Sequence, residues 1–233
     1  MKLAIMQPYF LPYLGYFQLI NAVDKFVVYD NIQYTKKGWI NRNRILSNGS
    51  DITFSIPLKK DSDYLDINKR FLADNSQQEK EKILRVISQN YKKASEFQII
   101  YPLLEKIFLN EEKNLFKFIL KSLLDINSFL EIETELSVSS EIYRDKKTNG
   151  KDTVMEICKS LKAQHYINPV NGKELYNKKE FQEVDLNLQF LEMGPVSYNQ
   201  FNDEFVSHLS IIDILMFNKK KKVLDFLNLY YLS

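Results

Sequence analysis

The chain has 233 residues, 45% of them hydrophobic, so it can bury a sizeable apolar core as one domain, with or without an inserted lobe. Its 32 basic and 30 acidic residues give a formal net charge of +2 and are mixed along the chain, which argues against a general nucleic-acid or membrane surface. Neither an opening signal sequence nor an apolar run of the roughly 18 residues needed for a transmembrane segment is found, so we expect a soluble, cytoplasmic protein.

The first 30 residues predict a parallel strand, loop, helix, strand unit. Residues 2–6 form a short apolar run that stops at Gln7-Pro8, which is typical of a buried strand ending in a loop. Residues 14–24 carry apolar side chains at helical spacing, and residues 25–30 are a second β-branched and aromatic run. The connection between the two runs is about 18 residues, which is long enough for a parallel crossover.

A hairpin and a helical lobe follow. Residues 39–58 are two extended runs around Asn48-Gly49, a strong signal for a tight β-hairpin turn. We expect the outer face of this hairpin to carry Asn41, Asn43 and Arg44. Residues 76–130 repeat apolar side chains every three or four residues, which predicts helices. The loops between these helices are short, so we expect the helices to stack antiparallel on one side of the sheet or to form a satellite bundle.

The rest of the chain returns to alternating strands and helices. We expect strands at 135–142, 165–169 and 186–193, a polar loop at 144–152, and helices at 152–163, 209–217 and 221–232. The pattern indicates an α/β fold in three segments: an N-terminal α/β half at 1–75, the helical lobe at 76–131, and a C-terminal α/β half at 132–233 that completes the same core.

Several long motifs carry a family resemblance. The segment MQPYFLPYLGYFQLINAVDKFVVYDNIQYTKKGWINRNRI at 6–45 resembles the signature of the WbqC-like family, and SVSSEI, YINPVNGKELY and QFNDEFVSHLSIIDILMFN resemble its later blocks. Members typically occur in gene sets for bacterial surface polysaccharides, including O-antigens that carry acylated or aminoacylated amino sugars. The resemblance therefore implies transfer of an acyl or aminoacyl group to the amine of a nucleotide-linked or lipid-linked amino sugar.

The layout of the opening unit is also similar to that of nucleotidyltransferases and adenylate-forming ligases. This likeness implies a Rossmann-like, nucleotidyltransferase-like parallel sheet with the hairpin and the helical lobe appended. In that group a glycine at the helix start, here Gly15, lets the backbone approach a phosphate closely. Tyr13 and Tyr16 stand where the group has histidines, and a phenol lacks the imidazolium charge, so the use of ATP stays open. A helix-entry turn with no ligand is the alternative.

The strand end at Asp30 and the polar run after it are the main site prediction. Asp30 could be the general base that takes a proton from an attacking amine, or it could pair with Arg42 or Lys36 and order the loop. Arg42 and Arg44 share a strand face and could hold a diphosphate or carboxylate; a hairpin with merely solvated charges is the alternative. We expect Asp30 and Tyr16 in catalysis, and substrate binding by Gln7, Tyr9, Tyr13, Gly15, Gln33, Tyr34, Lys36, Trp39, Asn41, Arg42, Arg44, Asn168, Gly172, Lys173 and Tyr176.

The remaining reactive residue types do not form a familiar catalytic pattern. The two histidines are far apart in sequence and no metal-ligand spacing is present, so we expect no metal. The single cysteine, Cys158, is expected to pack as a small hydrophobe. Ser210 is a natural helix N-cap, and Asp213 three residues later suggests a variant of the capping box, with a role for Asp213 in the cleft left open.

Three functions remain open from the sequence. The first is a transferase that uses an activated acyl or aminoacyl donor. The second is an adenylate-forming ligase or nucleotidyltransferase that uses ATP, and the third is a non-catalytic sugar-binding or assembly protein. The sequence does not determine the donor, the acceptor sugar, or whether the chain forms a homo-oligomer.

Overall fold

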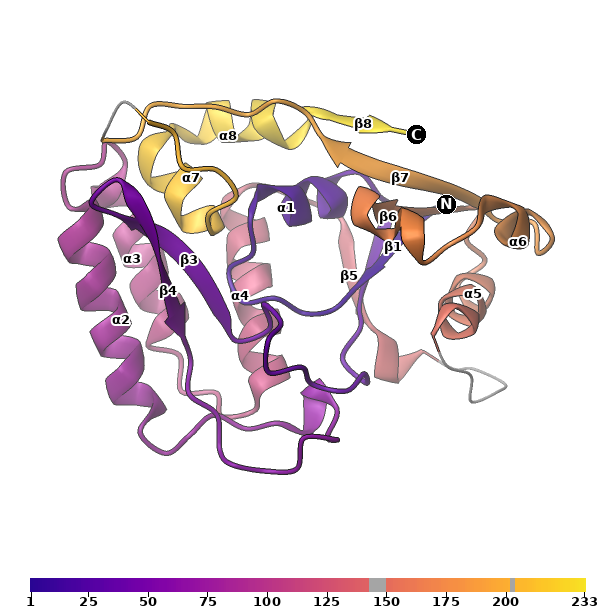
Figure 1. Cartoon of the computed structure of the whole chain (residues 1–233), viewed down its shortest axis with the longest axis horizontal. Helices are drawn as coiled ribbons and strands as arrows, with labels where there is room; N and C mark the ends of the chain where they lie inside the picture. Colours follow the sequence, from indigo (N-terminus) through magenta and orange to yellow (C-terminus); the bar gives the residue numbers. More distant parts are fainter. Residues whose placement is uncertain (143–149, 202–203) are drawn as a thin grey trace.

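The computed structural model describes residues 1–142, 150–201 and 204–233, and its centre is a sheet built from both ends of the chain. The described residues form a six-stranded sheet in the order β5-β2-β1-β6-β7-β8 (Figure 1). The strands are β5 (Glu135–Val138), β2 (Lys25–Val28), β1 (Lys2–Met6), β6 (His165–Pro169), β7 (Asn187–Met193) and β8 (Tyr230–Leu232). All neighbours pair in parallel except β7 and β8, which are antiparallel. The predicted α/β fold with a Rossmann-like parallel sheet is confirmed.

Successive side chains of the central strands point to opposite faces of the sheet, so the core consists of two clusters, one on each face. Leu3 and Ile5 of β1 belong to one buried cluster, whereas Ala4 between them belongs to the other. The first cluster packs on α5 (Lys151–Ser160) and α6 (Lys178–Gln182), and Cys158 is fully buried in it, as expected. Because successive side chains point to opposite faces, a central parallel strand must be apolar throughout, which is why the run at 2–6 is continuous.

The helical lobe and the hairpin cover the other face of the sheet. The lobe contains α2 (Ser76–Tyr91), α3 (Phe97–Phe108) and α4 (Leu115–Phe129), and its apolar side chains join those of α1 (Leu14–Asn21) in one continuous cluster. The lobe and the hairpin lie on one side of the molecule, and α5 and α6 lie on the opposite side (Figure 1). The lobe therefore stacks on one side of the molecule, with α2 against β3 of the hairpin.

The predicted hairpin is confirmed as a separate two-stranded sheet. It consists of β3 (Arg42–Ser47) and β4 (Ser50–Ser55), with Ser47 paired to Ser50. Asn48 and Gly49 have φ of 48° and 78°, the left-handed region that a two-residue hairpin turn with the right twist requires. The expectation that Asn41 and Asn43 lie on an outer face is wrong, since both are buried and their side-chain amides bond to backbone carbonyls.

Two predicted elements in the C-terminal part have different bounds in the structure. The strand expected at 135–142 ends at Val138 and continues as a 3₁₀ turn, Ser139–Glu141. The helix expected at 221–232 ends at Leu227, and the aromatic residues after it form β8. This strand pairs with the otherwise open edge of β7, which satisfies backbone groups that a continued helix would leave exposed. The expected loop at 144–152 lies largely outside the described residues.

The remaining helices close the molecule around α1. They are α7 (Ile211–Phe217) and α8 (Lys220–Leu227), with short 3₁₀ turns at Ile67–Lys69 and Val170–Glu174 elsewhere. Gln18 in the middle of α1 is fully buried and donates to the carbonyls of Phe226 and Leu229, which fixes the end of α8 on α1. Across the described parts of the chain, no helix has the length and apolar character needed to cross a membrane.

Candidate functional site

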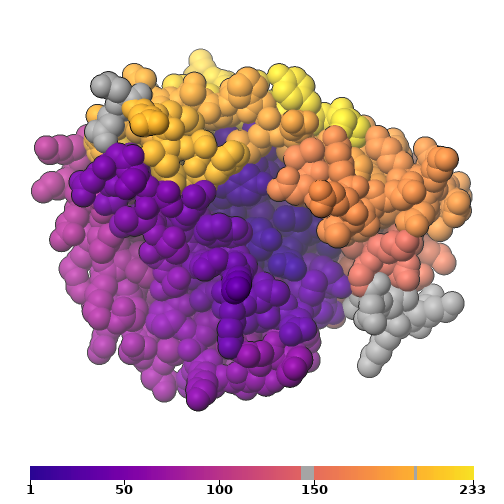
Figure 2. All heavy atoms as spheres, viewed as in Figure 1, coloured from indigo at the N-terminus to yellow at the C-terminus, as the bar shows by residue number. Residues whose placement is uncertain are grey.

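The strand order places a cavity where α/β proteins bind ligands. The chain leaves β1 toward β2 on one side and reaches β6 on the other, so the carboxyl ends of β1 and β6 form the point at which the strand order reverses. A cavity of about 1160 Å³ opens there and is lined by Met6 at the end of β1, by Gln7 after it, and by residues 168–172 at and after the end of β6. Figure 2 shows the face hollowed between the N-terminal segments and the region around β6 and α6.

The loop after β1 supplies aromatic rings and a glycine to one wall. Tyr9 and Tyr13 line the cavity, and burial raises the pKa of both phenols, so each keeps its proton and can donate a hydrogen bond. Gly15 also lines the cavity, but a Cβ there would lie 2.5 Å from the Tyr13 ring and 2.7 Å from the Met193 sulfur. The glycine is therefore required by the close packing of Tyr13 and Met193 against the start of α1.

The end of β6 supplies an ordered amide group. Asn168 is buried and its Nδ2 donates to the Tyr166 hydroxyl at 2.7 Å. A Cβ on Gly172 would lie 2.0 Å from the Asn168 Oδ1, so only glycine lets Asn168 occupy this place. The Tyr176 ring, which also lines the cavity, meets Tyr166 edge to face at 5.9 Å. The predicted group Asn168, Gly172 and Tyr176 is thus assembled on one wall.

The hairpin supplies the third wall with one arginine and one tryptophan. The guanidinium of Arg44 lies over the Trp39 ring at 5.6 Å, and both residues line the cavity. Arg44 Nη2 donates to the His208 carbonyl at 3.2 Å, and Nη1 lies 3.4 Å from an Asp51 carboxylate oxygen. These contacts hold the cation at the cavity edge and join the hairpin to the segment before α7.

The structure brings most, but not all, of the predicted substrate-binding residues to this cavity. The residues from the prediction that line it are Gln7, Tyr9, Tyr13, Gly15, Gln33, Trp39, Arg44, Asn168, Gly172 and Tyr176. The predicted substrate-binding residues that do not line it are Tyr34, Lys36, Asn41, Arg42 and Lys173, and the two residues predicted to be catalytic, Tyr16 and Asp30, do not line it either.

The predicted cations that stay outside the cavity have other partners. Arg42 donates through Nε to the Gly38 carbonyl at 3.0 Å and caps the Trp39 ring from 5.1 Å, so it stabilises the loop before β3. Lys36 pairs with Asp63 at 2.8 Å and is exposed, while Lys173 lies against the Phe190 ring. Arg42 and Arg44 are on the same strand face, but only Arg44 reaches the cavity wall.

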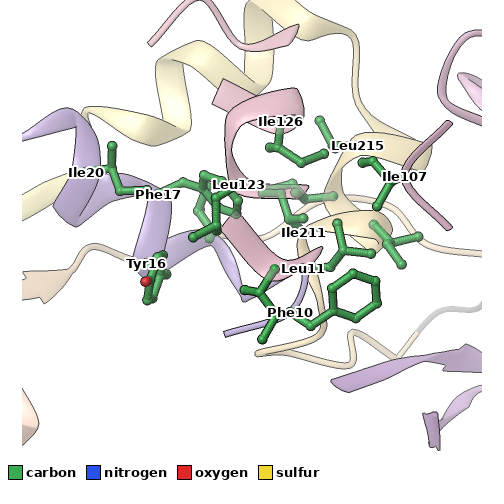
Figure 3. Close-up of a cluster of buried hydrophobic side chains, with 14 of the residues drawn as sticks. Phe10, Leu11, Tyr16, Phe17, Ile20, Ile107, Leu123, Ile126, Ile211 and Leu215 are labelled. Carbon is green, nitrogen blue, oxygen red and sulfur yellow. The ribbon is translucent and has the colours of Figure 1, made fainter. Parts of the chain in front are cut away.

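Tyr16 is part of the hydrophobic core. It is 2% exposed, its ring packs against Tyr9 and Phe26, and its hydroxyl donates to the Gln7 carbonyl at 2.9 Å. Figure 3 places it beside the buried cluster that contains Phe17 and Ile20. Burial raises its pKa well above the ordinary value. Tyr16 therefore shapes the loop that carries Gln7 and Tyr9 rather than facing the cavity.

Asp30 is enclosed by segments that arrive from elsewhere in the chain. It is 1% exposed, and its Oδ1 accepts from the Ser139 hydroxyl at 2.8 Å and the Ser140 N–H at 2.9 Å. Its Oδ2 accepts from the Ser140 hydroxyl at 2.7 Å and from Asn68 Nδ2 at 2.8 Å. Neither Arg42 nor Lys36 is its partner. Of the two readings of Asp30, these contacts fit a role in ordering the loops.

The polar wall also contains residues that sequence reasoning missed. Lys151, Asp66, Glu192 and His208 line the cavity together with Asn43. Asp66 pairs with Lys69 and Lys151 with Glu180, whereas the Glu192 side chain has no ion pair or hydrogen bond within the described residues. No local motif marks these positions, because their proximity depends on the strand order.

A second buried carboxylate, Asp213, lies beside the cavity wall in α7. Ser210 caps this helix as predicted, with its hydroxyl accepting from the Ile212 N–H. The capping-box reading of Asp213 is wrong, because its carboxylate accepts instead from the hydroxyls of Tyr91 and Tyr198 and from Gln200 Nε2. Asp213 does not line the cavity.

The fold and the site define an α/β protein with a mixed aromatic and polar cavity at its topological switch point. The profile of the WbqC-like protein family matches residues 7–224, so the chain belongs to this family. It is also similar to the uncharacterized protein Rv1507c of Mycobacterium tuberculosis (strain ATCC 25618 / H37Rv), with 30% identity over 229 residues that cover 97% of each chain. No solved structure matches the chain.

Proposed function

We propose that this protein transfers an acyl or aminoacyl group to the amine of a nucleotide-linked or lipid-linked amino sugar. The observation that carries the proposal is the cavity of about 1160 Å³ at the carboxyl ends of β1 and β6. This is the place where open α/β sheets bind their ligands, and the volume accommodates a sugar with a diphosphate and a base.

The composition of the walls supports a sugar ligand. Aromatic rings of Tyr9, Tyr13 and Trp39 offer flat apolar faces, on which a sugar ring or a base can pack. Gln7 and Asn168 bring side-chain amides that can bond to sugar hydroxyls. A site built from rings and amides, with its hydrogen-bonding groups held in place, is suited to a polyhydroxylated substrate.

The charges of the walls support a zwitterionic substrate. Arg44 and Lys151 can attract a phosphate, while the carboxylates of Asp66 and Glu192 can attract the ammonium group of an amino sugar. His208 adds an imidazole, which offers both a hydrogen-bond donor and an acceptor. The cavity thus combines groups for both ends of an amino sugar that is linked to a phosphate.

The reaction balances with an activated ester or thioester as donor. The ammonium first gives one proton to solvent, and the lone pair of the resulting amine attacks the carbonyl carbon and forms the new nitrogen–carbon bond. The bond from that carbon to the leaving oxygen or sulfur breaks, and the leaving atom takes the bonding electron pair. A wall residue such as His208 accepts the proton lost by nitrogen and returns it to the leaving group.

The assignment to surface-polysaccharide assembly rests on the family resemblance rather than on the cavity. A ligase that uses ATP is favoured less, because the space around Gly15 is filled by Tyr13 and Met193 instead of being open to a phosphate. A non-catalytic sugar-binding protein would have the same cavity, and only turnover separates it from a transferase.

Calorimetric titration with UDP- and dTDP-linked amino sugars, and with their N-acetylated counterparts, tests the proposal. We expect binding of the free amines, and a roughly 10- to 100-fold loss of affinity in Arg44→Ala, because a hydrogen bond to a charged group contributes about 1.5–3 kcal/mol. Arg85→Ala on the exposed face of α2 is the matched control and should bind normally. Absence of binding for every sugar, or equal loss in both variants, contradicts the proposal.

Mass spectrometry of the sugar after incubation with acyl thioesters tests the chemistry. The transferase predicts an added acyl mass on the free amine without pyrophosphate release. Pyrophosphate released from ATP would identify the ligase instead, and binding without any product would identify the non-catalytic protein.

A further inference from the structure

A second, smaller pocket adjoins the main cavity. It has a volume of about 440 Å³ and lies between the start of α1, the segment after β7, and α7. Tyr13, Met193 and His208 line both pockets, so these three side chains form a wall shared by the two spaces. A molecule that reaches past this wall would contact both.

The two pockets differ in the charge of their linings. Its lining contains the apolar side chains of Leu14, Val196 and Phe205, and none of the described residues that line it is Asp, Glu, Lys or Arg. The main cavity, by contrast, has Arg44 and Glu192 in its walls. The two spaces therefore suit two chemically different parts of a reaction.

A part-buried hydrogen-bond network occupies the polar end of Tyr198, one of the two tyrosines that line the second pocket. The Tyr198 hydroxyl donates to Asp213 at 2.6 Å, so its polar end is already satisfied and its ring is left to line the pocket. Gln200 donates to the same carboxylate at 2.7 Å and also bonds to the backbone of Val206 in both directions. This network holds Tyr198 and Gln200 against α7 and joins Gln200 to Val206.

The shared wall is itself held in place. His208 adopts φ of 55°, its ring meets the Tyr13 ring at 6.1 Å, and its carbonyl accepts from Arg44. Arg44, a cation in the wall of the main cavity, is thereby bonded to His208 at the boundary of the second pocket. A substrate phosphate near Arg44 would lie on the main-cavity side of this boundary.

We infer that the second pocket holds the hydrocarbon chain of the acyl donor, an inference that rests on the proposed function. The chain would lie among Leu14, Val196 and Phe205, where burial removes its surface from water. The donor carbonyl would then lie at the shared wall of Tyr13, Met193 and His208, facing the amine bound in the main cavity. The pocket therefore selects donors by the length of their acyl chain.

The test uses N-acetylcysteamine thioesters with acetyl, butanoyl, hexanoyl and octanoyl chains, whose dissociation constants are measured by calorimetry. We expect affinity to rise about fourfold for each buried methylene until the pocket is filled. Val196→Trp should fill the pocket and abolish this dependence while leaving the affinity for a UDP-linked amino sugar unchanged. Val184→Trp, at an exposed position outside both pockets, is the matched control and should keep the wild-type dependence.

A second variant covers the case in which Val196→Trp does not fold. Val196→Ala enlarges the pocket and should move the best chain length upward. Equal affinity for all four chains in the wild type, or an unchanged dependence in Val196→Ala and Val196→Trp, overturns the inference.

The test of the second pocket can fail or succeed independently of the test of the proposed acyl transfer. Chain-length dependence without acylation of any amino sugar would support the pocket and contradict the reaction. Acylation that is indifferent to chain length would support the reaction and contradict the pocket.

Discussion

Replacement of Asp30 distinguishes a structural role of its carboxylate from a catalytic one. In Asp30→Ala the Ser139 and Ser140 hydroxyls can rotate to other acceptors, but the Ser140 N–H and the Asn68 amide lose theirs in a part-buried site. A buried donor left unpaired costs about 1–3 kcal/mol, and water can reach this site in part, so the two donors predict a loss of roughly 2 kcal/mol in the free energy of unfolding. That is a large part of the stability of an ordinary domain.

Asp30→Asn should be milder. An amide nitrogen in place of Oδ2 faces the Ser140 hydroxyl, which can turn to accept, and Asn68, whose own Oδ1 is buried without a partner. Turning the Asn68 amide over presents that oxygen to the new donor and moves Nδ2 to the place of the unpaired oxygen, so the number of unpaired Asn68 groups does not rise. The free energy of unfolding should still fall by about 1 kcal/mol, because hydrogen bonds to a neutral amide are weaker than those to a charged carboxylate.

Urea denaturation of both variants, together with the rate of sugar acylation, provides the assay. The structural role predicts that Asp30→Asn keeps the wild-type rate and that Asp30→Ala loses rate only to the extent that it unfolds. If Asp30→Asn were as stable as the wild type yet acylated 100-fold or more slowly, Asp30 would be the general base and the structural reasoning would be refuted.

Three further predictions follow from other parts of the site and core. Gly172→Ala should displace Asn168, because the Asn168 Oδ1 would lie 2.0 Å from the new Cβ. Calorimetry should then record weaker sugar binding, and denaturation should record a loss of about 1–3 kcal/mol in the free energy of unfolding. Normal sugar binding would contradict this prediction. Burial raises the pKa of the Cys158 thiol to about 12, so iodoacetamide at pH 8 should modify the native protein far more slowly than the protein in urea, and equal rates would show that the thiol is accessible. Burial raises the pKa of the Asp213 carboxyl above its ordinary value of 3.8, so as pH rises the unfolded chain releases this proton before the folded protein does. The free energy of unfolding of the wild type should therefore fall relative to that of Asp213→Asn as pH rises from about 4. A difference between the two proteins that does not change with pH, or that changes the opposite way, refutes the shift.

The parts of the fold that depend on local pattern could be predicted from the sequence. The apolar run at 2–6, the helix after it and the hairpin turn at Asn48-Gly49 are all fixed by neighbours within a few residues. The residues after β1 that reach the cavity follow from the same pattern, because the end of a central parallel strand is where ligands bind. The last strand, β8, could not be predicted, since its partner is the distant edge of β7.

The parts of the site that depend on distant contacts could not be assigned from sequence. Arg42 and Arg44 have the same local pattern, and only the position of the hairpin against His208 sends one of them to the cavity. Asp30 obeys the strand-end rule, yet residues that come from 68 and 139–140 enclose it. Glu192 becomes part of the wall only because β7 lies beside β6.

A crystal structure of the protein with a UDP-linked amino sugar tests the central claim most directly. The account predicts that the sugar lies between the carboxyl ends of β1 and β6, with its ring against Tyr9 or Tyr13 and its diphosphate near Arg44. A sugar bound on another surface while this cavity is filled only by solvent would contradict it.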